Sequence, residues 1–221
     1  MFHFLMIFLA LGGKKIVFFY HIVTNKGNLE MKTQTKRGQY TLNSQQIQKI
    51  INSAGTFRDR LLLKILAYTG IRRDEAAGIE IKNFNPETRE ILIRGKGEKI
   101  RSVFLTEELN AELKIYLGKN QTRRFLFESK QRPNYPISSK QVNIICQRAG
   151  EAAGITNPNP AIKHINPHLF RHSLARRLKA AGTRIETISA LLGHSSITQT
   201  LETYGLPSQA EIKEEVLKAL A

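Results

Sequence analysis

Apolar residues recur at helical spacing through most of the chain after residue 40. The segment "YTLNSQQIQKIINSAG" places three isoleucines on one helical face, at Ile47, Ile50 and Ile51. Asn43 or Ser44 precedes this face and is suited to cap the helix. The next apolar run, "TFRDRLLLKILAYTG", predicts a second helix that ends at Gly70.

Between residues 71 and 105 the pattern changes from helical spacing to alternation. "RRDEAAGIEIKNFN" predicts a short helix followed by an alternating strand. Two further strand-like runs, Glu90–Arg94 and Ile100–Leu105, lie on either side of a glycine-rich turn and predict a β-hairpin. The following segment, "TEELNAELKIYLG", returns to helical spacing.

From Ser138 onward the pattern is nearly all helical, with "NPNP" as a loop. Asn166 and Pro167 form a start signal for one helix and Gly182 a stop signal. Three more helices are expected, each after a capping residue: Thr183, then Ser195 or Ser196, then Ser208. The chain is therefore predicted to be α+β, mainly α, with one small antiparallel sheet.

The first residues differ from the rest, because two apolar runs are separated only by Lys14 and Lys15. Each run is too short to span a bilayer. A secretory signal is not predicted, since no Lys or Arg precedes Gly12 and no A-x-A site follows. We treat residues 1–38 as an appendage without an assigned role and place the main domain at residues 39–221.

The charge balance of the 221-residue chain is strongly basic. Lys and Arg total 34 against 18 Asp and Glu, a formal net charge of +16. Such a surplus favours a polyanion as partner, nucleic acid first and an anionic membrane surface second. The single cysteine, Cys146, provides neither a disulfide framework nor a zinc cluster, and it is consistent with the cytoplasm.

Several short motifs carry candidate chemistry, and each has an ordinary alternative. His168 and Arg171 lie three apart on one helical face, as a phosphate-binding pair or as part of a basic patch. Glu75 stands three after Arg72 and can form an ion pair with it, or belong to a solvated charge cluster. Lys96 stands between two glycines at the hairpin tip, where it reaches a partner or simply completes a basic turn.

The stretch "LLGHSSITQTLETYG" has two interpretations. By itself it fits two helices joined by a tight turn, as in modules that read a DNA groove. Ile197, Leu201 and Tyr204 share one helical face, which favours a tyrosine that packs in the core. The alternative is that His194 and Tyr204 belong to one active site.

Taken in order, the motifs "TGIRRDE", "RGKGEK", "HLFRH", "LGHSS" and "ETYG" resemble the tyrosine recombinase family, also called phage integrases, which includes the Xer-type recombinases. The resemblance covers about Tyr40 to Leu220. It implies a tyrosine recombinase catalytic-domain fold with Tyr204 as nucleophile. The other catalytic residues that it implies are Arg72, Lys96, His168, Arg171 and His194, with Glu75 behind them. Lys99 is an alternative to Lys96, and the expected DNA contacts are Arg73, Lys99, Arg101 and His172.

The resemblance implies a site-specific recombinase that cuts and rejoins double-stranded DNA through a 3′-phosphotyrosine. Two arginines would hold the phosphate oxygens, so no metal and no cofactor are expected. The alternatives are a non-cleaving DNA-binding protein on the same scaffold and a type IB topoisomerase-like enzyme.

The sequence departs from the family pattern in two places. The residues before the catalytic motifs do not look like the helical core-binding domain of most relatives. Tyr204 follows His194 at one position more than the family pattern has, and Thr203 stands at the usual position. Relatives also assemble as oligomers through the last helix. The segment 208–221 has the apolar stripe for that contact, or for packing on its own chain.

Overall fold

The structure is a computed structural model that describes residues 3–11, 14–22, 40–95, 100–118, 123–193 and 209–220. The chain divides into two compact units, residues 1–37 and 38–221. In the first unit, β1 (His3–Leu11) and β2 (Lys14–Ile22) pair as antiparallel strands. None of the helices in the described part of the chain has the length and apolar character needed to cross a membrane.

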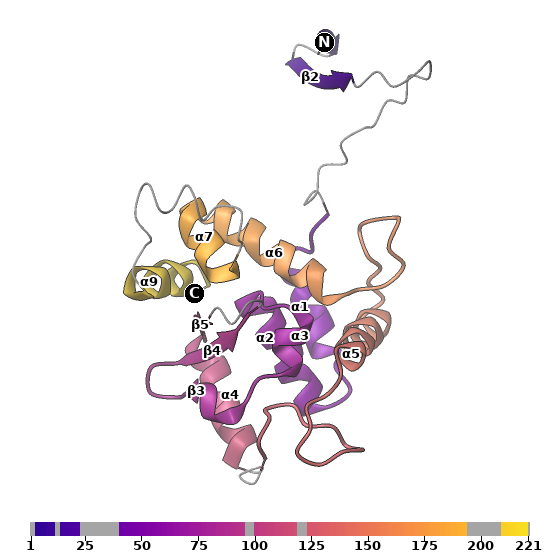
Figure 1. The fold of residues 1–221 in the computed structure, drawn as a ribbon. Helices are drawn as coiled ribbons and strands as arrows, with labels where there is room; N and C mark the ends of the chain where they lie inside the picture. Colours follow the sequence, from indigo (N-terminus) through magenta and orange to yellow (C-terminus); the bar gives the residue numbers. More distant parts are fainter. Residues whose placement is uncertain are drawn as a thin grey trace. The chain divides into compact units, whose positions relative to one another are not determined.

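In the part that the structure describes, the second unit is mainly helical, with one small sheet (Figure 1). The α-helices among its described residues are α1 (Ser44–Asn52), α2 (Phe57–Thr69), α3 (Arg73–Ala77), α4 (Glu107–Gly118), α5 (Ser139–Ala152), α6 (Pro167–Ala180), α7 (Ile185–Leu192) and α9 (Gln209–Leu220). The antiparallel sheet has the order β3 (Phe84–Asn85), β4 (Glu90–Arg94) and β5 (Ile100–Phe104). The predicted class, α+β and mainly α, is confirmed.

Local signals in the sequence set the ends of the first two helices as predicted. The Asn43 side chain accepts from the backbone N–H of Gln46 at 2.8 Å, and the Gln46 side chain accepts from the Asn43 N–H at 3.0 Å, which completes a capping box. Gly70 ends α2 in the left-handed region, with φ of 63°. A Cβ there would lie 2.6 Å from Cδ2 of Leu192, so the contact between α2 and α7 also requires glycine.

Two details of the sequence-based prediction are wrong. The strand expected in "GIEIKNFN" is reduced to β3, because the backbone before it pairs elsewhere: Ile81 donates to Arg124 at 2.9 Å and Ile79 accepts from Leu126 at 2.8 Å. Thr183 does not cap α7, which begins after Arg184. The Thr183 N–H instead donates to the carbonyl of Leu178 at 3.0 Å and closes the end of α6.

Helix α2 lies at the centre of the unit and packs against α1, α3, α4 and α6. Every residue from Leu61 to Ala67 is buried, and this run includes the charged Lys64. The ammonium of Lys64 is paired at 2.7 Å with both Glu108 and Glu112 of α4, which offsets the cost of its burial. The end of α2, where Gly70 leads into Arg72, is therefore held by a well-packed element.

The apolar stripe of α9 packs on its own chain. Ile212 and Val216 are buried, and α9 contacts α6, α7 and β5. Glu215 accepts from Arg184 at 2.6 Å, and the Lys213 ammonium donates to the Thr88 carbonyl at 2.5 Å. Of the two alternatives open for this stripe, the structure shows the contact with the same chain.

Candidate active site

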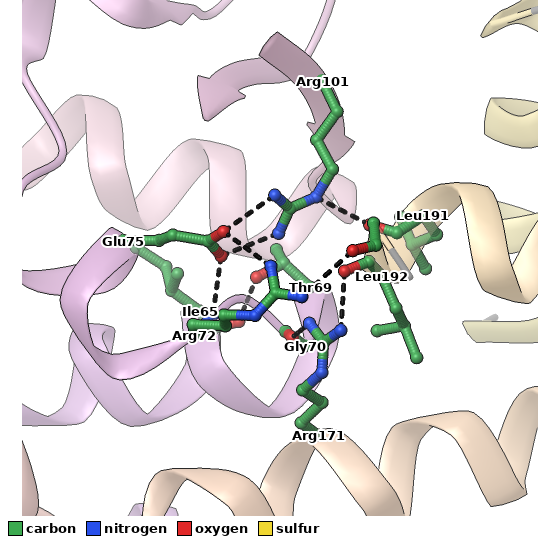
Figure 2. Close-up of polar contacts among 10 residues, drawn as sticks. Ile65, Thr69, Gly70, Arg72, Glu75, Arg101, Arg171, Leu191 and Leu192 are labelled. Atoms are coloured by element: carbon green, nitrogen blue, oxygen red, sulfur yellow. Dashed lines mark hydrogen bonds and ion pairs between the residues drawn. The ribbon is translucent and has the colours of Figure 1, made fainter. Parts of the chain in front are cut away.

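Two arginines from different parts of the fold, Arg72 and Arg101, bind the carboxylate of Glu75, and a third, Arg171, lies beside them (Figure 2). Arg101 on β5 donates Nη1 to Oε1 at 2.9 Å and Nη2 to Oε2 at 2.7 Å. Arg72 donates its backbone N–H to Oε2 at 2.7 Å and its Nη1 to Oε1 at 3.1 Å. The predicted Arg72–Glu75 ion pair is therefore present, and Arg101 binds the same carboxylate in a bidentate manner.

The same three arginines also hold the C-terminal end of α7. Helix ends expose carbonyl oxygens that have no partner within the helix and carry partial negative charge. Each guanidinium donates to one of three consecutive carbonyls: Arg101 Nε to Leu191 at 3.0 Å, Arg171 Nη2 to Leu192 at 2.6 Å and Arg72 Nη2 to Gly193 at 3.0 Å. The end of α7 is thereby tied to β5, to α6 and to the start of α3.

Arg171 is the most enclosed of the three. It lies on α6 with 5% of its surface exposed, and its Nη1 donates to the Gly70 carbonyl at 2.7 Å. Burial lowers its pKa, and the nearby charges of Arg72 and Arg101 lower it further, to about 10. At neutral pH the group stays charged, so Arg171 brings a fixed cation to the end of α2.

Two opposing effects, burial and hydrogen bonding, set the pKa of Glu75. Burial by itself raises the pKa of this carboxyl, but the hydrogen bonds from Arg101 and Arg72 outweigh burial and lower the pKa to about 2. The cluster holds three guanidiniums and one carboxylate, of which two guanidiniums bind the carboxylate directly, so positive charge is in excess. Such a site suits an anion with several oxygens, such as a phosphodiester.

The two histidines of α6 lie beside this cluster. Partial burial lowers the pKa of His168, and the charges of Arg171, Arg73 and Arg72 act in the same direction. The pKa of His172 is lowered by burial, His168 and Arg171, and the two rings are 6.4 Å apart. The lowered pKa favours the neutral form of both imidazoles, which is the form that accepts a proton.

The structure brings together only part of the predicted set. Arg72, Glu75 and Arg171 converge, and His168 shares their electrostatic environment. Arg73 is exposed and lies 3.7 Å from Asp74. Four predicted residues lie outside the described residues: Lys96, Lys99, His194 and Tyr204. The helix and caps expected at residues 195–208 lie there too.

The place of Arg101 in this cluster was not predicted from the sequence. It was expected to contact DNA, whereas its side chain, 11% exposed, is turned to Glu75 and Leu191. A signal was available, because Arg101 lies two residues before the buried Val103, on the same face of β5, and its cross-strand partner Ile93 is also buried. An arginine on the inward face of a strand needs a buried partner.

The low pKa of Glu75 predicts a pH-dependent contribution to stability. The pKa falls from an ordinary 4.5 to about 2 on folding, so the contribution is present above pH 4.5 and is lost as the pH falls toward 2. We expect Glu75→Gln to lower the free energy of unfolding at neutral pH by on the order of 3 kcal/mol. The difference from wild type should shrink in urea titrations at progressively lower pH.

The matched control for this experiment is Glu214→Gln, which removes an exposed carboxylate on α9. It should leave the stability within about 0.5 kcal/mol of wild type at every pH. A Glu75→Gln difference that is the same at all pH values would contradict the assignment of the low pKa.

Comparison with known proteins agrees with the geometry. The model of the phage integrase family matches residues 40–210, and the chain belongs to this family. It is 29% identical over 198 residues to the tyrosine recombinase XerC of Treponema denticola, a match that covers 80% of this chain and 62% of that protein. It is 32% identical over 184 residues to XerA of Pyrococcus furiosus, over 81% and 61% of the two chains. The chain thus matches less than two thirds of the length of either relative.

Solved structures show the same fold. The crystal structure of XerA recombinase is similar with a TM-score of 0.63 and 27% identity, over 80% of this chain and 64% of that one. XerH site-specific recombinase, bound to its difH substrate before cleavage, is similar with a TM-score of 0.61 and 27% identity, over 73% and 49%. The integrase of mycobacterium phage Brujita, 18% identical with a TM-score of 0.67, shares the fold.

Proposed function

We propose that this chain is the catalytic part of a site-specific DNA recombinase, and that it cuts and rejoins DNA strands through a phosphotyrosine at Tyr204. The observation that carries the proposal is the convergence of Arg72 and Arg171 beside Glu75, within a chain of the phage integrase family. Two fixed guanidiniums stabilise the extra negative charge of a pentavalent phosphorus without a metal ion or cofactor.

The hydrogen bonds of the two arginines leave donors for a phosphate. Each terminal nitrogen of a guanidinium carries two hydrogens. Arg171 uses one on Nη1 for Gly70 and one on Nη2 for Leu192, while Arg72 uses one on Nη1 for Glu75 and one on Nη2 for Gly193. Among the described residues, each terminal nitrogen therefore keeps a second hydrogen for a non-bridging oxygen.

In the proposed step, the Tyr204 oxygen forms a bond to phosphorus, and the bond from phosphorus to the 5′ oxygen breaks. The proton of Tyr204 passes to a base, for which His168 is suited because its lowered pKa favours the neutral, proton-accepting form. Lys96, or Lys99 on the same hairpin, protonates the departing 5′ oxygen, and His194 donates to a phosphate oxygen. Rejoining is the reverse of these transfers.

A nicked duplex tests the proposal. Target sites are first selected by binding from a pool of random duplexes, and each is then nicked so that the released strand diffuses away. We expect a covalent protein–DNA adduct on a denaturing gel. Binding without any adduct supports the alternative of a non-cleaving protein, and relaxation of supercoiled plasmid without recombination supports a topoisomerase-like enzyme.

We further propose double-stranded DNA as the partner and the cytoplasm as the compartment. The net charge of +16 supports a partner with dense negative charge. Because counterions are released on binding, the logarithm of the affinity should fall steeply and linearly with the logarithm of the salt concentration. A flat response would mean that the charge serves another purpose.

We also propose that the protein works as a homo-oligomer on DNA, as a tetramer on synapsed sites. If segment 208–221 makes the contact, Ile212 and Val216 must exchange their burial on the same chain for equal burial on a neighbour. Sedimentation of the protein with and without two-site DNA tests this, with assembly expected only on DNA.

A further inference from the structure

We propose that Arg101 is a positioning residue of this active site, which holds Arg72 in place through Glu75 and the end of α7 in place through Leu191. The inference rests on the proposed function, since it names what keeps the phosphate-binding arginine in position. It replaces the DNA contact that the sequence suggested for Arg101.

The first support comes from the hydrogen bonds that Arg101 donates. All three of its nitrogens bind protein atoms: Nε binds the Leu191 carbonyl, and the two terminal nitrogens bind both oxygens of Glu75. The side chain is 11% exposed and that of Glu75 is 6% exposed, compared with 38% for Arg72. Arg101 differs from Arg171 in that both of its terminal nitrogens bind the Glu75 carboxylate, so its guanidinium is held in an ion pair behind the more accessible Arg72.

The second support is the packing around the Arg101 stem. Gly193 has φ of 64°, and a Cβ on it would lie 3.3 Å from Cδ of Arg101 and 3.4 Å from Nε. The glycine at the end of α7 thus permits the close approach of the guanidinium. Gly193 is followed directly in the sequence by His194, so Arg101 contacts the turn that leads into the next predicted catalytic residue.

The consequence for Arg72 follows from the shared carboxylate. Glu75 binds Arg72 through two hydrogen bonds and Arg101 through two more. Without Arg101, burial acts on Glu75 with fewer opposing bonds, so the carboxyl takes up a proton more readily. A protonated Glu75 holds the Arg72 guanidinium less firmly, and misplacing a phosphate-binding group slows the reaction.

The cleavage rate of the Arg101→Met variant tests the proposal. The matched control is Arg148→Met, which changes an exposed arginine on α5. We expect single-turnover cleavage of the nicked duplex to fall by roughly 10- to 100-fold in Arg101→Met, as for residues that orient a reactive group. The affinity for DNA should change by less than about 3-fold. Arg101→Lys keeps the charge but not the bidentate contact, and it should be intermediate.

A double-mutant cycle separates positioning from a merely structural role. Because Arg101 acts on Arg72 through Glu75, the variant with both Arg101→Met and Glu75→Gln should cleave no more slowly than the worse single variant. The proposal would be overturned if the fold losses of rate in the two single variants multiplied in the double variant. It would also be overturned if Arg101→Met lost as much DNA affinity as cleavage rate.

The pH profile supplies a signature that a structural role would not move. In Arg101→Met the cleavage rate should begin to fall at a higher pH than in wild type as the pH is lowered, since Glu75 then takes up a proton more readily. The additional Glu75→Gln change should remove this shift. A profile equal to that of wild type would count against the proposal.

One measurement needs no catalysis. In carbon-13 NMR spectra of the free protein, the Glu75 carboxyl should not titrate above about pH 4 in wild type, and should do so in Arg101→Met or, if that variant fails to fold, in Arg101→Lys. If wild type forms no adduct, the proposed function fails while this titration still decides what Arg101 holds. If wild type forms the adduct and Arg101→Met does so equally fast, the positioning role fails and the function stands.

Discussion

Tyr204→Phe is expected to abolish the covalent adduct with nicked DNA. The change removes only the phenolic oxygen that would bond to phosphorus, so the variant has no Tyr204 nucleophile to form the adduct. The cleavage rate should fall by roughly 10⁶-fold, as when the nucleophile of a covalent enzyme is removed. Affinity for the selected DNA should stay within about 3-fold of wild type, because one hydroxyl adds little to a phosphate-dominated contact.

Two matched variants make this result specific. Tyr135→Phe removes the hydroxyl of an exposed tyrosine and should leave the adduct unchanged. Thr203→Ala tests the neighbouring hydroxyl, which stands where the family pattern has its tyrosine, and it should also retain the adduct. An adduct that persists in Tyr204→Phe and disappears in Thr203→Ala would assign the nucleophile to Thr203.

Arg171→Lys is expected to lower the cleavage rate by roughly 10³-fold or more while weakening DNA binding only modestly. The guanidinium of Arg171 reaches the Gly70 and Leu192 carbonyls and retains further donors in a planar fork. An ammonium concentrates its donors at one point, so it cannot bind both carbonyls and a phosphate oxygen in the same geometry. Single-turnover cleavage and equilibrium binding on the same duplex give the two values.

The change also loosens the fold, so a structural control is needed. A buried carbonyl that loses its donor costs about 1–3 kcal/mol. Arg177, on the same helix, is also partly buried and donates to the Ala67 carbonyl at 2.7 Å. Arg177→Lys should therefore lower stability in urea without a comparable loss of cleavage rate. Equal losses of rate in the two variants, or equal losses of binding and cleavage in Arg171→Lys, would argue against a catalytic role for Arg171.

Local signals predicted the helices well, because caps and stops act over a few residues. Asn43 and Asn166 cap their helices as predicted, and Gly70 ends α2. The prediction failed where backbone groups had more than one available partner. Ile79 and Ile81 bond to the segment 124–126 rather than to β4, and Thr183 closes α6 rather than capping α7.

The candidate site shows the same division. The Arg72–Glu75 pair was predictable because two residues three positions apart at a helical turn are neighbours in space. The approach of Arg101 to Glu75 joins residues 26 positions apart, and that of Arg171 to Gly70 joins residues 101 positions apart. Such contacts depend on how α2, β5, α6 and α7 pack, which periodicity does not specify.

By itself the sequence determined the order of the motifs, the basic charge, the helical class and the residue types suited to a phosphate. These depend on composition and on spacing within single elements. Only the tertiary structure decided that three guanidiniums hold three successive carbonyls at the end of α7, and that α9 packs on its own chain. Buried charges and helix ends need partners, and the fold brings those partners together from distant parts of the chain.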